Sequence, residues 1–174
     1  MTVSEPSITT CPGCGLEMPA GRRHYDRKFN ASAECWSVFE EVLAAEFENA
    51  VLFGRVHQLS VDAYTVQHAG GPHPDKSVCI HLAGLYLTQA EGLAPVRVAP
   101  FLQRLAARPA WPHLDPPAER AAITVFDVAM ADSPEVHATR VLEWAAEVWR
   151  AWRPYHGVAR DLISSVIDPP PRAG

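Results

Sequence analysis

The sequence predicts a mainly α-helical protein, built as an irregular bundle of five to seven helices. Apolar residues recur at helical spacing through most of the chain. The 16 prolines stand mostly between these apolar segments, where they separate one helix from the next. Hydrophobic residues make up 48% of the 174 positions and the formal charge is −5, a balance typical of a globular chain. Because no internal repeat or second unit is visible, we expect a single domain over residues 1–174.

Two helices are expected in the first half of the chain. Asn30 or Ser32 can cap a helix over about 32–48. A second helix over about 50–68 carries two adjacent apolar stripes, so it should be buried over a wide arc. The acidic residues of the first helix are expected to form a solvated face: Glu40, Glu41, Glu46 and Glu48.

The second half of the chain carries further helical patterns, each with its own start or stop signal. In chain order they are a helix over about 76–92 capped by Asp75, a helix over about 96–107, a short helix opened by a Thr124–Asp127 capping box, a long helix that starts at Ser133-Pro134 and is broken near Pro154, and a last stretch to about 167. Cys79 and the tryptophans at 144, 149 and 152 are expected in the core.

The most informative motif is the turn Cys11-Pro-Gly-Cys14-Gly15. Two cysteines separated by two residues can bind one zinc ion through a tight turn, since zinc prefers tetrahedral thiolate or imidazole ligands. A redox pair or unpaired thiols are the alternatives. A redox pair of the thioredoxin type opens a helix, and Gly15-Leu-Glu-Met-Pro19 is a poor helix start. We therefore expect a flexible tail over 1–10, a zinc-knuckle segment over 11–35 and the helical bundle over 36–167.

A closed zinc site needs two further ligands. Cys35 suits the third position, because it lies in the first turn of the first helix, as in treble-clef or ribbon-type zinc fingers; its alternative role is a buried apolar thiol. The fourth ligand is one of four histidines: His24, His57, His68 and His81. His57 and His68 lie roughly 16 Å apart along one helix and cannot share an ion. We predict the ligand set Cys11, Cys14, Cys35 and His68, in which the loop after the helix turns His68 towards the metal.

Three polar residues in the helical region are candidates for catalysis: His57, Asp62 and His81. Asp62 lies about 140° around the helix from His57, so it can serve a neighbouring helix instead. An isolated histidine is more often a hydrogen-bonded core or boundary residue than a catalyst. Together these histidines could also form a second, His-rich site inside the bundle.

Several segments together resemble an uncharacterised bacterial domain-of-unknown-function family over nearly the whole chain. They are Cys11-Pro-Gly-Cys-Gly-Leu16, Ala33-Glu-Cys-Trp36, Leu52-Phe-Gly-Arg-Val-His57-Gln-Leu-Ser-Val-Asp-Ala-Tyr-Thr-Val-Gln-His68 and His81-Leu82, followed by a Trp-rich helix like Trp144 to His156. The resemblance supports the expected fold and the marked positions. It implies no reaction.

Three function classes remain open. The first is a structural-zinc module that binds a protein partner, the second a metal-dependent enzyme (a hydrolase or thiol transferase), and the third a regulator that senses metal or thiol oxidation. The sequence contains no Gly-x-Ser-x-Gly, Walker, Gly-x-Gly-x-x-Gly or His-Glu-x-x-His motif, which favours the first class.

Charge and hydropathy restrict the partners and the compartment. The partner is expected to be a protein or a small molecule, and the negative charge argues against nucleic acid. No apolar run approaches the roughly 20 residues that span a bilayer. The N-terminus lacks the basic and apolar regions of a signal peptide, so we expect a cytoplasmic protein whose four cysteines are reduced.

Overall fold

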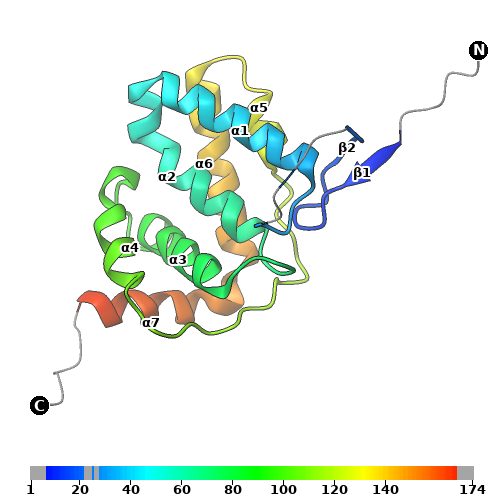
Figure 1. Cartoon of the computed structure of the whole chain (residues 1–174). Coiled ribbons are helices and arrows are strands. Elements are labelled where there is room, and N and C mark those ends of the chain that lie inside the picture. Colours follow the sequence, from blue (N-terminus) through cyan, green and yellow to red (C-terminus); the bar gives the residue numbers. More distant parts are fainter. Residues whose placement is uncertain (1–6, 22–24, 26–27, 168–174) are drawn as a thin grey trace, which may run out of the picture.

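The computed structural model describes residues 7–21, 25 and 28–167, and it confirms a mainly α-helical, irregular bundle (Figure 1). Seven α-helices occur in these residues: α1 (Ala33–Glu48), α2 (Ala50–Gln67), α3 (Asp75–Leu85), α4 (Ala99–Leu105), α5 (Val125–Ala129), α6 (Pro134–Ala151) and α7 (His156–Ile167). Three short helical turns join them: η1 (Tyr86–Ala90), η2 (Pro95–Arg97) and η3 (Arg153–Tyr155).

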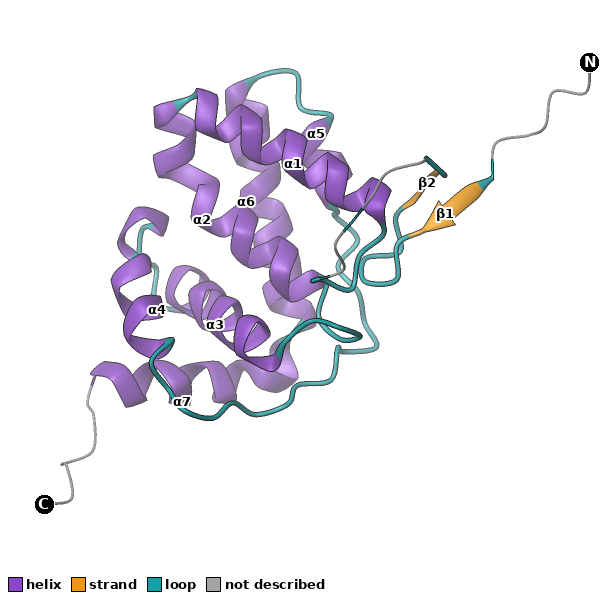
Figure 2. Ribbon diagram, in the orientation of Figure 1, coloured by secondary structure: helices purple, strands orange, loops and turns teal. Residues whose placement is uncertain are grey.

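A small β-hairpin precedes the helices, and its two strands are the β-strands of the described residues (Figure 2). β1 (Ile8–Thr10) pairs antiparallel with β2 (Glu17–Pro19), so that Thr9 lies opposite Met18. The expectation of a flexible tail over 1–10 is therefore wrong for residues 8–10, while residues 1–6 lie outside the described part. The strand forms because the knuckle turns the chain back on itself, which offers its backbone groups hydrogen-bond partners.

Side-chain caps fix where the first two helices begin. The Ser32 side chain accepts a hydrogen bond from the backbone N–H of Cys35 at 3.1 Å, which begins α1 one residue after the predicted start. The Asn49 side chain accepts from the N–H groups of Val51 and Leu52, so this single residue ends α1 and caps α2. The two helices consequently form a tight helical hairpin.

The core is organised around α2, which packs against α1, α3 and α6. Tyr64, in the last turn of α2, is fully buried and stacks on Phe39 of α1, with ring centroids 3.8 Å apart. Trp144 of α6 meets the same ring edge-on, and its indole N–H donates to the Gln67 side chain at 2.9 Å. Burial on these three sides matches the wide apolar arc expected of α2.

The predicted helix over 76–92 is shorter and less regular in the structure. α3 ends at Leu85 and continues as the π-helical turn η1. The predicted Asp75 cap is wrong, because Pro74 occupies the N-cap position and Asp75 is the first helical residue. The Asp75 carboxylate accepts a hydrogen bond from His113 at 2.7 Å and caps no backbone N–H group. The Thr124–Asp127 capping box is confirmed, and so is the Ser133 cap of α6.

The long helix α6 ends at Ala151, three residues before Pro154, and η3 leads into α7. This break is the predicted effect of a proline ring on the preceding turn. Cys79, Trp144 and Trp152 are buried and Trp149 is partly buried, as expected of core residues. None of the helices in the described residues combines the length and apolar character needed to cross a membrane.

Candidate metal centre

Four thiol and imidazole groups converge where the hairpin meets the helical bundle. Cys11 and Cys14 come from the turn between β1 and β2, Cys35 from the first turn of α1, and His68 from the residue that ends α2. One ligand atom from each lies within 4.8 Å of all the others, and all four side chains are buried. The fold thus brings together the four residues that the sequence analysis predicted as ligands.

The distances suit a shared metal ion. The Sγ atoms of Cys14 and Cys35 are 3.8 Å apart, and Cys35 Sγ lies 3.3 Å from Nε2 of His68. Thiolates at about 2.3 Å from a tetrahedral zinc ion lie about 3.8 Å from each other, and about 3.6 Å from a ligating imidazole nitrogen. The cluster therefore has the dimensions of a four-coordinate site.

The orientation of His68 is set by the end of α2. Its Nδ1 lies 2.7 Å from the carbonyl oxygen of Tyr64, one helical turn earlier, and its N–H donates a hydrogen bond to that oxygen. This bond leaves the lone pair of Nε2 directed at the cysteines, which is the arrangement that metal-ligating histidines usually show. The Tyr64 ring stacks on the imidazole at 4.0 Å and fixes its plane.

Glycine is required at two positions of the knuckle. A Cβ atom on Gly13 would lie 2.5 Å from the carbonyl oxygen of Asn30 and 2.6 Å from Cδ2 of His68. Gly15 has a φ of 82°, a left-handed conformation that other residues rarely adopt. Asn30 also holds the loop after α2, since its backbone N–H donates to His68 O at 3.2 Å. The turn can thus approach the histidine closely.

The electrostatics of the cluster favour a bound cation. Hydrogen bonds from the Cys14 and Cys35 thiols lower the pKa of Cys11, whereas the neighbouring Cys11 and Cys14 groups raise the pKa of Cys35. Burial alone would lower the pKa of His68, but Cys11 and Cys14 outweigh it and raise that pKa to about 9. Negative charge is thus favoured on the buried sulfur of Cys11, beside a His68 imidazole that tends to hold a proton. A metal cation would stabilise that charge and displace the protons.

The other predicted site residues lie elsewhere. His24 falls outside the described residues. His57 Nδ1 lies 2.8 Å from a Glu46 carboxylate oxygen, and His81 Nδ1 lies 2.6 Å from Oδ1 of Asp62. Neither histidine belongs to the four-ligand cluster. Asp62 does serve a neighbouring helix, because His81 is in α3.

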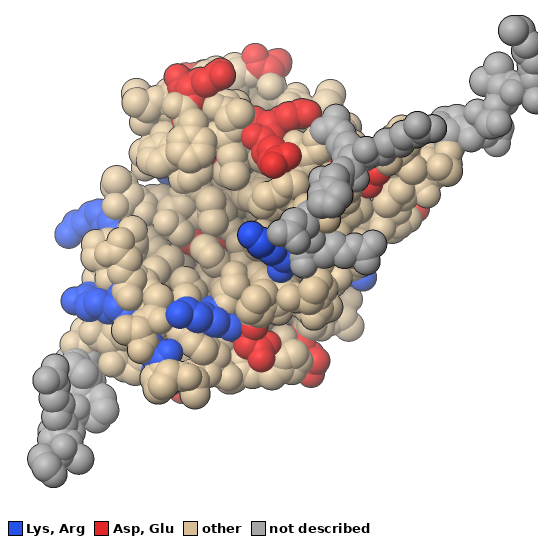
Figure 3. Space-filling view, viewed as in Figure 1, with Lys and Arg blue, Asp and Glu red and all other residues tan. Residues whose placement is uncertain are grey.

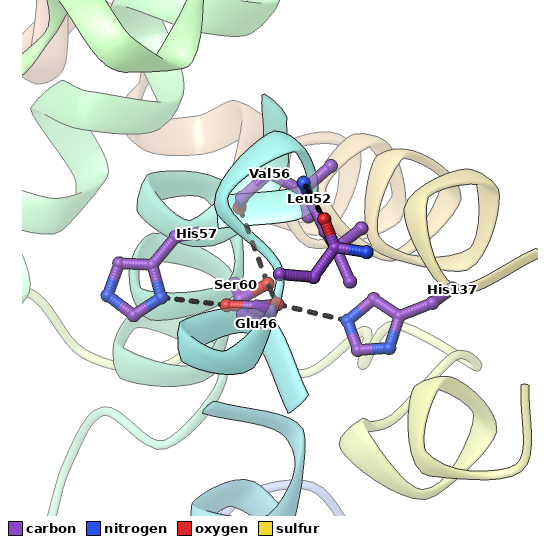
Figure 4. A network of polar contacts seen from close by, with 7 residues as sticks. Glu46, Leu52, Val56, His57, Ser60 and His137 are labelled. Atoms are coloured by element: carbon purple, nitrogen blue, oxygen red, sulfur yellow. Dashed lines mark hydrogen bonds and ion pairs between the residues drawn. The ribbon is translucent and has the colours of Figure 1, made fainter. Parts of the chain in front are cut away.

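A second buried polar network surrounds Glu46 at the end of α1 (Figure 4). Its fully buried carboxylate accepts hydrogen bonds from Ser60 Oγ at 2.5 Å, His57 Nδ1 at 2.8 Å and His137 Nε2 at 3.1 Å. Burial alone would raise the pKa of Glu46, but the bonds from His137, His57 and Ser60 outweigh it and lower that pKa. The network joins α1, α2 and α6 through one ionised group.

This role of Glu46 was not predicted from the sequence. The solvated face predicted for the glutamates of α1 is wrong at this position, although Glu40, Glu41 and Glu48 are exposed. The available signal was helical spacing: Glu46 lies four residues after Val42 and seven after Phe39, on the buried stripe of the helix. A charged residue on such a stripe indicates a buried partner.

Asp62 is the centre of a third polar group. Its carboxylate is fully buried, and Oδ1 accepts hydrogen bonds from His81 and from Gln58 Nε2 at 2.8 Å. Oδ2 has no hydrogen-bond partner among the described residues, and burial raises the pKa of this carboxyl. Gly84 of α3 leaves the necessary space, since a Cβ atom there would lie 2.7 Å from Asp62 Cγ.

Comparison with known proteins places the chain in a family without an established activity. Residues 9–153 match a family of unknown function (DUF5946), and the chain belongs to that family. No curated protein and no solved structure matches the chain significantly. The matched range includes all four residues of the metal cluster and the Glu46 and Asp62 networks.

Proposed function

We propose that the protein is a protein-interaction or regulatory module whose N-terminal segment is held to its helices by a structural zinc ion. The observation that supports this is the ligand set: three thiolates and one imidazole, all buried, from three separate segments of the chain. Four protein ligands complete the tetrahedral shell of zinc and leave no position for water or substrate, as in structural sites.

The zinc ion would attach the short β-hairpin to the helical bundle. β1 and β2 are three residues each, and a two-stranded hairpin of that size is marginal in water. Zinc would join this hairpin to the start of α1 and the end of α2. Free, buried thiols at Cys11, Cys14 and Cys35 are the groups that zinc requires, and we place the protein in a reducing compartment, the cytoplasm, where such thiols persist.

Elemental analysis of the purified protein tests whether a structural zinc ion is bound. We expect about one zinc ion per chain, and loss of zinc together with a lower Tm in Cys35→Ser and His68→Ala. Cys79→Ala is the matched control, because Cys79 is a buried thiol outside the cluster. A wild-type protein without zinc, or a Cys35→Ser variant that keeps a full zinc equivalent, would contradict the proposal.

A metal-dependent enzyme, such as a hydrolase or thiol transferase, is the second candidate, and the Asp62–His81 pair favours it. The His81 side chain is 21% exposed, and its Nδ1 bond to buried Asp62 leaves Nε2 available for proton transfer. His57 has the same relation to Glu46.

Cobalt substitution separates the two functions. A closed site should give a four-coordinate Co²⁺ spectrum that added azide does not change. A spectrum that shifts with azide would show an open position and favour the enzyme. In that case His81→Gln and His57→Gln become the variants to assay for hydrolysis.

A further inference from the structure

A pocket of about 300 Å³ lies between the Cys11–Cys14 turn and the end of α6. One wall is the turn itself, a second is the loop over residues 116–121, and the end of α6 forms the floor. The loop follows α4 and passes beside the β-hairpin on its way to α5 (Figure 1). It is packed closely there, since a Cβ atom on Gly70 would lie 2.9 Å from Cγ of Pro116. A hollow of this size, at the junction of separate segments, suits a small molecule.

The floor of the pocket is apolar. Val148, Ala151 and Trp152 line it, and all three residues are buried. Pro12 and Pro117 add apolar groups on the two walls. An apolar group inside the pocket would lie against these side chains instead of water, which favours its binding.

The uncharged polar side chains of the pocket are already hydrogen-bonded within the protein. The Gln67 side chain accepts from the Trp144 indole N–H and donates to the carbonyl oxygen of Ile123, both at 2.9 Å. The Asn30 amide donates to the carbonyl oxygen of Ala69 at 3.1 Å. These groups shape the pocket, but their main hydrogen bonds are made inside the protein.

The carbonyl groups at the adjacent helix ends are paired as well. Unpaired carbonyls at a helix C-terminus carry partial negative charge and would repel an anion. At the end of α2, the carbonyl oxygens of Tyr64 and His68 accept from the backbone N–H groups of His68 and Asn30. At the end of α6, the Trp149 carbonyl oxygen lies 2.8 Å from Nε2 of His156. The helix ends therefore oppose an anion only weakly.

Two charged residues line the pocket, and they differ in their partners. The Glu119 carboxylate pairs with Arg153 at 3.4 Å. Arg120 has no hydrogen bond or ion pair to any residue that the structure describes. Its guanidinium lies over the Cys11–Cys14 turn, because a Cβ atom on Gly15 would be 3.1 Å from Nη1 of Arg120. With Arg153 counted, the rim has a net positive charge and one guanidinium available to a ligand.

The overall charge of −5 does not exclude an anion at this position. Acidic side chains are unevenly distributed: on the face drawn in Figure 3 they gather over α1, whereas basic ones gather around α4. α1 contributes no lining residue to the pocket. The local charge is therefore set by Arg120, Glu119 and Arg153.

We propose that this pocket binds a small organic acid that carries one carboxylate on an apolar body. The carboxylate would pair with the Arg120 guanidinium, whose planar fork matches two carboxylate oxygens, and the body would lie on the floor beside Trp152. A singly charged group suits the rim better than a phosphate, because Glu119 would repel the higher charge. The inference rests on the proposed function, since the zinc-bound turn supplies one wall and the acid would be the ligand of the regulatory module.

The test is fluorine NMR of the full-length protein with three acids of increasing length: para-fluorobenzoate, para-fluorophenylacetate and para-fluorophenylpropionate. At least one should bind saturably and raise the Tm. Its binding should weaken at least about tenfold in Arg120→Ala, because hydrogen bonds to a charged group are lost. Arg120→Lys should weaken it less, since it keeps the charge and loses the fork. Arg97→Ala is the matched control, because Arg97 is an exposed arginine outside the pocket.

The charge of the probe gives a second comparison. The neutral para-fluorophenylacetamide and the cationic para-fluorophenethylamine have the same ring, and both should bind at least about tenfold more weakly than the best acid. Glu119→Gln should leave acid binding unchanged or strengthen it, because it removes a negative charge from the rim.

Three results would overturn the inference. They are a zinc-loaded wild type that binds none of the acids, acid binding that Arg120→Ala leaves unchanged, and an amine that binds more tightly than the acids and depends on Glu119. Zinc content measured on every variant separates this inference from the zinc site. A metal-free wild type that still binds an acid refutes only the structural zinc ion, whereas a zinc-loaded protein that binds no acid refutes only the ligand.

Discussion

Glu46→Gln tests whether the Glu46 network depends on charge. The substitution keeps the shape of the side chain but removes the carboxylate that accepts from His57, Ser60 and His137. One amide oxygen can still accept from Ser60 and His137. The amide NH₂ then faces His57 Nδ1, so that histidine must change its tautomer to remain bonded.

The expected magnitude follows from the kind of bond lost. Hydrogen bonds to a charged group contribute about 1.5–3 kcal/mol each and neutral ones about 0.5–1.5 kcal/mol. Removal of a buried charge also relieves some desolvation, so we expect a net loss of roughly 1–3 kcal/mol, or a Tm lower by roughly 2–12 °C. Glu46→Ala leaves three donors without an acceptor and should cost about 3–5 kcal/mol.

Thermal and urea denaturation, followed by circular dichroism at pH 7 and pH 4, measure this loss. Because the folded state lowers the pKa of Glu46, its contribution is present above the unfolded value of about 4.3 and lost as pH falls through the folded pKa. The difference between wild type and Glu46→Gln should therefore shrink at low pH. Glu41→Gln, exposed on the same helix, is the control. A Glu46→Gln variant within 0.5 kcal/mol of wild type at pH 7 would refute the reasoning.

Two further substitutions test the close contacts of the metal centre and of Asp62. Gly13→Ala should lower zinc affinity, measured by competition with a chromophoric chelator, because its Cβ would collide with Asn30 and His68; equal affinity would show that the knuckle can shift. Asp62→Asn should raise stability at pH 7. The raised pKa of Asp62 makes folding less favourable as pH rises from about 4 through the folded pKa, and asparagine removes that loss. A variant whose stability follows the same pH curve as wild type would contradict this assignment.

Local signals in the sequence predicted much of the fold. Ser32, the Thr124–Asp127 box and Ser133 each cap a helix where a short polar side chain precedes an apolar periodic segment. The spacing of Cys11 and Cys14, with Cys35 in a first helical turn, was enough to predict three members of the cluster. His68 was one of four candidate histidines, favoured by its place at a helix end, where the chain can turn.

Features that depend on contacts between distant segments were not predictable in this way. β1 is too short to show a strand pattern, and it forms only because the knuckle returns the chain to β2. The π-helical turn after Leu85 has no marker in the sequence. Glu46 was read with its exposed neighbours, because its histidine partner on α6 is 91 residues away. Charge pattern alone cannot show which glutamate of a helix is buried.

The position of α2 explains why so many polar residues of one helix are buried. Its 18 residues extend about 27 Å: His57 and Ser60 bind Glu46 near the middle of the helix, and His68 enters the Cys/His cluster at its C-terminal end. Asp62 binds α3 between them. Apolar packing alone would let a helix slide or rotate between neighbours, whereas directed polar contacts at three points along its length fix its register. A helix fixed in this way can hold the Cys11–Cys14 turn of the β-hairpin close to His68 at its C-terminal end.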